Sequence, residues 1–271
     1  MRDKQIHGTK AVNLISVLMR HPGEFRDRVT MILESRLSCV RHGAPAYITT
    51  DLKTVTTRLG GVLSQEPRHP LREDRFRDLE LSVRDRLAVL PSDAPFRRDH
   101  NGDIVLAKIC YMVVRQLRPS CVLETGVCYG ITSAFILAAL EENHAGELHS
   151  IDLPPLGQNG DRFVGWAVAD DLRKNRWQLH RGLSRKILPR LLRRLGSIHL
   201  FVHDSLHTYG NMRFEFELAW THMAPGAVLI SDDIQGNAAF QELTRSADVS
   251  FHAAIQEFEK DSLLGIAIKR G

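Results

Sequence analysis

The sequence has few cysteines and no long apolar run, and both absences narrow what the chain can be. Its 271 residues contain 4 cysteines, none in the Cys-x-x-Cys spacing of zinc or redox sites. Free thiols in a reducing cytosol are therefore expected for Cys39, Cys110, Cys121 and Cys128. No apolar stretch reaches the ~18 residues that a membrane-spanning helix needs, and no signal-peptide pattern follows Met1. We expect a soluble, cytoplasmic protein.

The net charge of the chain is also small. Lys and Arg number 36 against 32 Asp and Glu, so the formal net charge is +4. The basic residues are not interleaved with aromatic ones, so nucleic acid is not indicated as a partner. The densest basic run, residues 185–194, is interpreted as the solvated face of an amphipathic helix. The alternative is a phosphate- or membrane-binding patch.

From Ile104 onward, apolar strand-like segments alternate with helical ones. Strands are predicted at 121–124, 148–152, 177–180, 198–204, 227–232, 251–257 and 263–269, and helices at 104–117, 131–141, 164–174, 184–195 and 211–223. Strands separated by helices of this length predict an α/β fold with a mostly parallel sheet. The last two strands predict an antiparallel hairpin that closes one edge of the sheet.

Residues 1–100 differ in character from the rest. Helical spacing of apolar residues occurs at 11–19 and 24–37, and His21-Pro22-Gly23 between them is interpreted as a helix breaker. Residues 44–63 are threonine-rich without a clear period, and residues 65–99 are charged and punctuated by proline. We interpret this part as a helical N-terminal extension to a domain at 101–271. It could cap a substrate or contact another subunit.

The segment from Val122 to Gly130 combines a buried strand, a glycine turn and the start of a helix. Such a turn lets the backbone approach a nucleotide-like ligand closely. Asp152, at the end of the next strand, suits the two hydroxyls of a ribose. Glu124 would repel a pyrophosphate but attract a cationic amino group. S-adenosylmethionine carries both a ribose and a cationic amino group, so it is the leading hypothesis for the ligand.

Two further strand ends carry acids. Asp204 and His207 follow one strand, and Asp232 and Asp233 follow the next. Because parallel strands place their carboxyl ends at one edge, these groups should meet the cofactor turn there. Three aspartates suit Mg²⁺, and His207 could remove a proton. Alternatively, the acid pair caps a helix, Asp204 bonds a turn, and His207 is structural.

With these residues in view, the chain from about Ile104 to Lys269 resembles a class I S-adenosylmethionine-dependent methyltransferase. The resemblance rests on residues 124–130, Asp152, residues 181–184 and Pro225-Gly226. Residues 164–168, 204–209 and 232–233 resemble the branch of macrolide-sugar O-methyltransferases and cephalosporin hydroxylase-like proteins. The resemblance implies a Rossmann-like fold, Mg²⁺ held by Asp204, Asp232 and Asp233, and His207 as the base, with Asp204 beside it. The cofactor-binding residues are then Glu124, Thr125, Gly126, Gly130, Thr132, Asp152, Ser184 and Asp204.

We therefore expect an O-methyltransferase that acts on a hydroxyl of a sugar or glycosylated natural product. A hydroxylase-like oxidoreductase component and a non-catalytic S-adenosylmethionine-binding protein remain alternatives. A dinucleotide-dependent dehydrogenase is disfavoured because the turn has Gly-x-x-x-Gly where a dinucleotide site has Gly-x-Gly-x-x-Gly. The apolar faces of the extension leave a homo-oligomer open.

Overall fold

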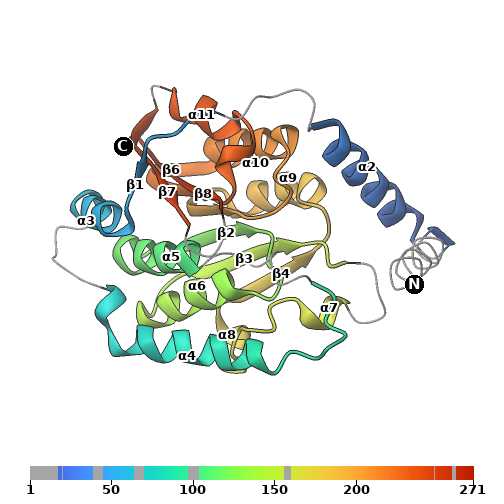
Figure 1. The fold of residues 1–271 in the computed structure, drawn as a ribbon, viewed down its shortest axis with the longest axis horizontal. Coiled ribbons are helices and arrows are strands. Elements are labelled where there is room, and N and C mark those ends of the chain that lie inside the picture. The colour runs from blue at the N-terminus through green and yellow to red at the C-terminus, as the bar shows by residue number, and fades with distance from the viewer. Residues whose placement is uncertain are drawn as a thin grey trace.

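The fold is built on one eight-stranded sheet (Figure 1). The computed structural model describes residues 18–19, 21–38, 45–63, 70–96, 104–155, 160–246, 248–257 and 261–271. The strand order is β1-β7-β8-β6-β5-β2-β3-β4. The strands are β1 (Thr49–Thr50), β2 (Cys121–Thr125), β3 (Glu147–Asp152), β4 (Trp177–Arg181), β5 (Ile198–His203), β6 (Met223–Ser231), β7 (Val249–Gln256) and β8 (Leu263–Lys269). Only the pairs that include β8 are antiparallel, so the prediction of a mostly parallel sheet is confirmed.

Helices cover both faces of the sheet (Figure 1). They are α2 (Pro22–Ser38), α3 (Leu52–Leu63), α4 (Asp74–Ala88), α5 (Ile104–Leu117), α6 (Ile131–Glu142), α7 (Gly160–Phe163), α8 (Asp170–Asn175), α9 (Ser184–Leu195), α10 (Tyr209–His222) and α11 (Ala239–Thr244). Successive strand residues face opposite sides, so Val122 of β2 packs into the core with α3 to α6, and Leu123 into the core with α9 to α11. Every residue of β2 is buried as a result.

The N-terminal part shares the main core. Val55 and Leu59 of α3 are fully buried, and Phe76 of α4 is 3% exposed, all in the cluster that also contains α5 and α6. Two further contacts attach it. Thr49 and Thr50 pair in parallel with β7, and Glu73 before α4 pairs with Arg115 of α5 at 2.8 Å.

Three expectations need correction. Residues 164–174 do not form one helix, because Gly165 has a φ of +72° and its N–H bonds to Cys128 O at 2.9 Å. That segment packs on the glycine turn instead. The helix expected at 24–37 begins two residues early, at Pro22, since a proline is preorganised for the first helical turn, and the expected break is present at His21, which is not helical. The hairpin β7–β8 does not form the edge of the sheet as expected, because β1 pairs with β7 and is the last strand on that side.

Other expectations fall partly or wholly outside the described residues. The helix expected at 11–19 is described only at Leu18 and Met19, and both Cys39 and the boundary at 100/101 are outside. The other three cysteines form no disulfide, and Cys110 and Cys121 are buried. Among the described residues, no helix has the length and apolar character that crossing a bilayer requires.

Candidate functional site

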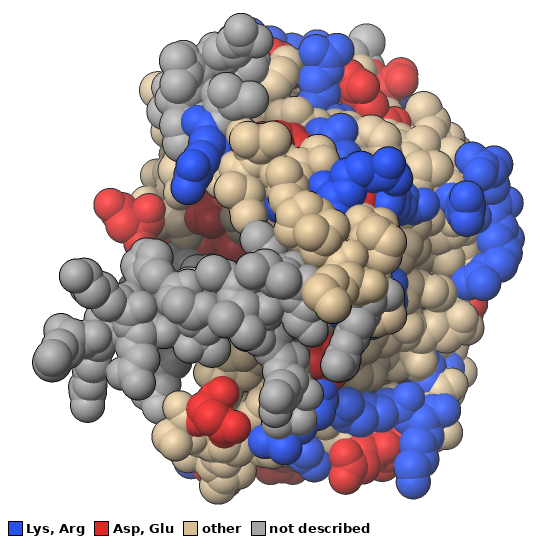
Figure 2. Space-filling view, turned by 90° about the vertical axis from the view of Figure 1, so that its right-hand side faces the viewer, with Lys and Arg blue, Asp and Glu red and all other residues tan. Residues whose placement is uncertain are grey.

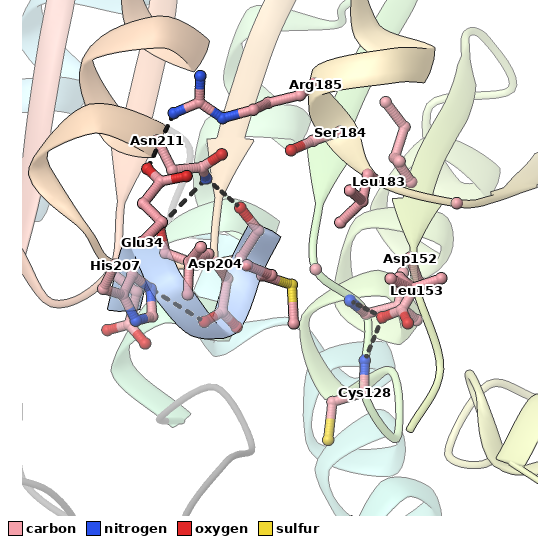
Figure 3. A pocket seen from close by; sticks show the side chains of 18 of the residues that line it. Glu34, Cys128, Asp152, Leu153, Leu183, Ser184, Arg185, Asp204, His207 and Asn211 are labelled. Carbon is pink, nitrogen blue, oxygen red and sulfur yellow. Dashed lines mark hydrogen bonds and ion pairs between the residues drawn. The ribbon is translucent and has the colours of Figure 1, made fainter. Parts of the chain in front are cut away.

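A cavity of about 520 Å³ lies at the carboxyl ends of the parallel strands. Segments far apart in the sequence line it, namely 126–128, 151–153, 182–185, 204–207 and 232–233, together with Phe96, Asn211 and part of α2. Figure 3 shows Asp152 and Cys128 on one side and Asp204 and His207 on the other. The predicted meeting of the glycine turn with the second group of acids is therefore present.

The glycine turn is tight enough to require glycine at both ends. Gly126 has a φ of +85°, and a Cβ built there would lie 1.9 Å from the Asp204 carbonyl oxygen. Gly130 has a φ of +79°, and its Cβ would lie 2.6 Å from Gly165 Cα. Gly126 lines the cavity, whereas Gly130 begins α6 away from the lining. The turn thus brings bare backbone to the cavity wall.

Asp152 holds the turn from the neighbouring strand. Its Oδ2 accepts hydrogen bonds from Val127 N at 2.7 Å and from Cys128 N at 3.0 Å. Burial raises the pKa of this carboxyl above its ordinary value, and the two N–H donors counteract the rise. Asp152 is 9% exposed and lines the cavity. An acid at this place can accept hydrogen bonds from ligand hydroxyls through Oδ1, which neither backbone bond uses.

Glu124 lies outside the residues that line the cavity. Its Oε2 accepts from Ser133 Oγ and Ser150 Oγ, both at 2.7 Å. Its Oε1 is buried and has no hydrogen-bond partner among the described residues. Burial raises the pKa of Glu124 to about 7, although both serine donors lower it. A nearby cation would therefore stabilise the ionised form.

Three other predicted cofactor residues have different surroundings. Ser184 begins α9 and lines the cavity. Thr125 is fully buried and donates to Glu215 of α10 at 2.6 Å, away from the cavity lining. Thr132 is 6% exposed, and its buried Oγ1 has no partner among the described residues.

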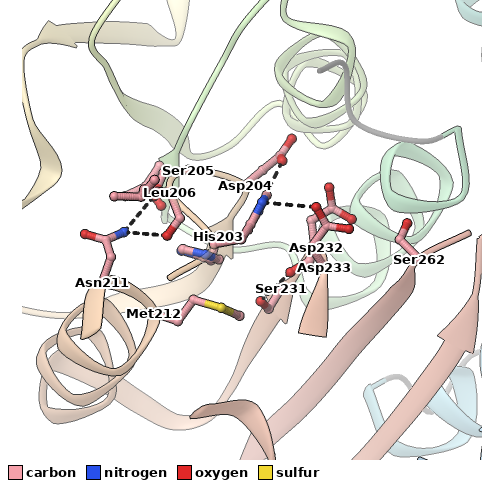
Figure 4. A network of polar contacts seen from close by, with 12 residues as sticks. His203, Asp204, Ser205, Leu206, Asn211, Met212, Ser231, Asp232, Asp233 and Ser262 are labelled. Carbon is pink, nitrogen blue, oxygen red and sulfur yellow. Dashed lines mark hydrogen bonds and ion pairs between the residues drawn. The ribbon is translucent and has the colours of Figure 1, made fainter. Parts of the chain in front are cut away.

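The acid and histidine residues after β5 and β6 lie together in one cluster, and Figure 4 shows Asp204 near the pair Asp232 and Asp233. One ligand atom each from Asp204, His207 and Asp232 lie within 4.8 Å of one another. His207 Nδ1 is 3.1 Å from Asp233 Oδ2, and its Nε2 is 3.8 Å from Asp204 Oδ1. Such oxygen-rich groups suit a hard divalent cation.

The sequence did not identify Glu257 as a member of this cluster. Its carboxylate groups with Asp232 and Asp233 within the same 4.8 Å limit, and it is 3% exposed. Strand direction is the signal that could have found it. Two antiparallel steps, β6 to β8 and β8 to β7, return β7 to the direction of β6, so the carboxyl end of β7 reaches the same edge.

The α2 helix forms a wall of the cavity, which sequence analysis also missed. Thr30, Met31 and Glu34 line it. Glu34 Oε1 accepts from Thr208 Oγ1 at 2.8 Å and pairs with Arg185 at 2.9 Å. The other ion pairs of α2 with the body are Glu24–Arg181 at 2.9 Å and Asp27–Lys186 at 2.6 Å. These pairs hold α2 against the end of β4 and the start of α9.

The basic run at 185–194 has the predicted character. In α9, Leu188, Leu191 and Leu192 are buried, whereas Arg190 and the arginines at 193 and 194 are exposed. On the face shown in Figure 2, Lys and Arg side chains form several groups with acidic side chains among them. The prediction of an amphipathic helix is confirmed, although Arg185 and Lys186 at its start pair with α2.

Comparisons with known proteins agree with this geometry. A family model described as a methyltransferase domain matches residues 123–234. No curated protein sequence matches the chain. Among solved structures, an O-methyltransferase from Bacillus cereus in complex with SAH has a TM-score of 0.54 and 16% identity, covering 81% of this chain and 100% of that one.

Two further structures are similar in the same way. The O-methyltransferase TomG from Streptomyces achromogenes, involved in tomaymycin synthesis and in complex with SAM, has a TM-score of 0.52 and 18% identity and covers 80% of this chain and 96% of its own. The SAH-bound methyltransferase PaMTH1 from Podospora anserina has a TM-score of 0.56 and 11% identity, with coverage of 84% and 100%. The methyltransferase-domain model thus matches residues 123–234, and the chain shares its Rossmann-like fold with these methyltransferase structures.

Proposed function

We propose that the protein transfers the methyl group of S-adenosylmethionine to a hydroxyl oxygen, with Mg²⁺ assistance and His207 as the general base. One observation carries the proposal. The glycine turn with Asp152 and the acid–histidine cluster line the same cavity. A methyl donor on one side and a hydroxyl on the other could therefore be held close and aligned, which displacement chemistry requires.

The donor side fits S-adenosylmethionine. At Gly126 the turn has no room for even a methyl side chain, so its backbone is exposed to the ligand. Asp152 lies beside the turn and can accept hydrogen bonds from the ribose hydroxyls. Glu124 is assigned to the methionine amino group on the strength of its buried, unpartnered Oε1. Ionisation of Glu124, whose pKa is about 7, would be favoured by that cation.

On the acceptor side, His207 is the proposed base for the hydroxyl proton. A carboxylate at 3.1 Å from Nδ1 favours the neutral tautomer that carries its proton there, which leaves Nε2 as the basic nitrogen. Asp204, Asp232 and Asp233 would hold the ion, which lowers the pKa of a bound hydroxyl and orients it. Glu257 adds a carboxylate to the same cluster.

The acceptor is proposed to be a sugar or a glycosylated natural product. Polar groups of the cluster suit a polyhydroxylated ligand, and Met31 with Phe96 adds an apolar wall. The O-methyltransferases among the similar structures support a hydroxyl acceptor. We also propose that the N-terminal extension caps the substrate, because residues of α2 line the cavity. Homo-oligomerisation stays a prediction.

Calorimetry with S-adenosylmethionine tests the donor assignment. We expect binding by the wild-type protein and by Asp85→Ala, an aspartate with a 72% exposed side chain away from the cavity lining. Asp152→Ala should lose about tenfold or more in affinity, because a buried acceptor for ligand hydroxyls is removed. Absence of binding by the wild-type protein would sink the proposed function, and unchanged binding by Asp152→Ala would remove the ribose assignment.

The acceptor and the ion are tested by mass spectrometry of products from a panel of glycosides, with and without Mg²⁺. We expect a mass gain of one methylene on a glycoside, lost in His207→Ala. Calorimetric titration of Mg²⁺ should show weaker affinity for Asp204→Ala than for Asp85→Ala. Equal affinity in the two variants contradicts the metal site. Turnover that needs a redox cofactor or iron, without methyl transfer, would favour the hydroxylase-like alternative.

A further inference from the structure

One buried carboxylate beneath the cavity connects the cofactor turn to the acid–histidine loop. Glu215 of α10 is fully buried. Its Oε2 contacts Thr125 Oγ1 at 2.6 Å and His203 Nδ1 at 2.7 Å, and its Oε1 accepts from Ser205 Oγ at 2.9 Å and Asn211 Nδ2 at 3.0 Å. Four donors from the end of β2, the end of β5, the following loop and α10 therefore meet on one group.

The surroundings of the carboxylate favour its ionised form. Burial alone would raise its pKa, but the adjacent His203 and the hydroxyl donors outweigh burial and hold the pKa of Glu215 at about 2. Hydrogen bonds to an ionised acceptor are stronger than neutral ones. A buried charge whose donors are removed is strongly destabilising, so the four donors and the carboxylate hold one another in place.

The donors occupy the positions that set the site's geometry. Thr125 directly precedes Gly126 of the cofactor turn. His203 and Ser205 are the two neighbours of Asp204 in sequence, and the Asp204 N–H donates to Thr125 O at 2.8 Å. Asn211 Nδ2 also contacts Ser205 Oγ at 3.2 Å and Leu206 O at 3.1 Å, contacts visible in Figure 4. Each bond restrains the segment that carries Asp204 and His207.

We propose that Glu215 is a positioning residue, which fixes the loop bearing Asp204 and His207 against the cofactor turn without touching a ligand itself. Glu215 is absent from the cavity lining, whereas Ser205 and Asn211, which it holds, are part of it. Its influence on activity rests on the proposed function, but its influence on the loop does not. The two can be measured separately.

Amide hydrogen exchange of the loop provides the first measurement. Glu215→Gln removes the charge and keeps the shape, and Glu217→Gln makes the same change two residues along α10, where the side chain is 63% exposed and pairs with Arg213. We expect exchange in peptides covering residues 203–209 to rise about tenfold in Glu215→Gln, the equivalent of losing one charged hydrogen bond. Glu217→Gln should match the wild type. Loop exchange that is equal in the two variants overturns the proposal.

A milder substitution covers the case in which Glu215→Gln does not fold. Ser205→Ala deletes one donor to Glu215 together with its contact to Asn211. Exchange in the same peptides should then rise about fivefold, the effect of one net hydrogen bond. Wild-type protection in Ser205→Ala would contradict the role assigned to Glu215.

Kinetics separate positioning from general damage. For methyl transfer, Glu215→Gln should lower kcat about tenfold or more while KM for S-adenosylmethionine stays within about threefold, because misplacement of a catalytic group acts mainly on the reacting geometry. A rise in KM alone with an unchanged kcat contradicts positioning. If the wild-type protein transfers no methyl group, the proposed function fails, and hydrogen exchange still decides the role of Glu215.

Discussion

Gly126→Ala is the most informative single change at the cofactor turn. An alanine Cβ at this position would lie 1.9 Å from the Asp204 carbonyl oxygen, 2.5 Å from its carbon and 3.0 Å from Ser205 N. All three atoms are backbone, so no side chain can rotate away. Ordinary van der Waals contact begins near 3.4 Å, so the turn and the Asp204 loop must separate by about 1.5 Å.

Two costs add in this variant. A non-glycine residue at a φ of +85° costs about 1–2 kcal/mol, and overpacking against a fixed neighbour costs about 1–3 kcal/mol. We therefore expect Gly126→Ala to lower the free energy of unfolding by about 2–5 kcal/mol. Because the separation moves Asp204 away from the turn, affinity for S-adenosylmethionine should fall about tenfold or more.

Gly226→Ala is the matched control. Gly226 has a φ of +77°, but no atom lies within 4 Å of the Cβ position, so only the backbone strain of about 1–2 kcal/mol applies. Urea denaturation of both variants gives the two free energies, and calorimetry gives the affinities. If Gly126→Ala is no less stable than Gly226→Ala and binds S-adenosylmethionine like the wild type, the close approach of turn and loop is refuted.

Three further changes test other parts of the structure. Burial raises the pKa of Glu124 from 4.5 to about 7, so ionisation of this carboxyl destabilises the fold as the pH rises between these two values. In denaturant titrations, the free energy of unfolding of Glu124→Gln should therefore rise by about 3 kcal/mol relative to that of the wild type from pH 4 to pH 8. A difference between the two proteins that does not change with pH contradicts the buried carboxyl. Arg181→Gln removes the hydrogen-bonded partner that does most to hold the pKa of Glu24 near 2, and with it one attachment of α2 to the body. Proteolysis within α2 should therefore accelerate a few-fold, and high salt should have the same effect on the wild type. Equal cleavage rates would count against the ion pairs. Leu59→Ala should lower the free energy of unfolding by about 2–5 kcal/mol, because Leu59 is fully buried in the core that α3 shares with the rest of the protein. Thermal unfolding should remain one cooperative transition. A separate early transition of α3 would contradict the shared core.

Much of the fold could be predicted because its strands are short apolar runs between amphipathic segments. The helices at 104–117 and 184–195 have the predicted ends, and every predicted strand from 121 onward is present within a few residues. Local pattern was insufficient where tertiary contact decides. The helix expected at 164–174 is interrupted at Gly165, whose φ of +72° lies outside the helical region and whose N–H bonds to Cys128 O of the glycine turn.

The N-terminal half shows the same limit. Residues 44–63 as a whole show no clear period, yet Leu52–Leu63 forms α3, with Val55 and Leu59 buried at helical spacing. The helix is begun by Asp51, whose Oδ1 accepts from Thr54 N at 2.9 Å. That cap was readable from the sequence. The position of α2 against the cavity was not, since it depends on pairs such as Glu34 with Arg185, 151 residues apart.

The candidate site divides along similar lines. Residues at strand ends, such as Asp152 and Asp204, could be predicted because parallel strands bring their carboxyl ends to one edge. Glu124 and Thr125 precede the turn as expected, but neither is part of the cavity lining, and they bond to Ser133 and Glu215 respectively. Glu215 was not recognised, because a helical glutamate gives no sequence signal of the four donors that surround it.

The two-residue strand β1 has a consequence for the integrity of the sheet. Thr49 and Thr50 pair with Ala254 and Ile255 of β7, which would otherwise end the sheet on that side. An open edge offers unpaired N–H and C=O groups to strands of other molecules and promotes aggregation. The short segment before α3 therefore protects the edge of β7 from pairing with other molecules. A shortened protein that begins after Thr50 would expose this edge and should aggregate more readily.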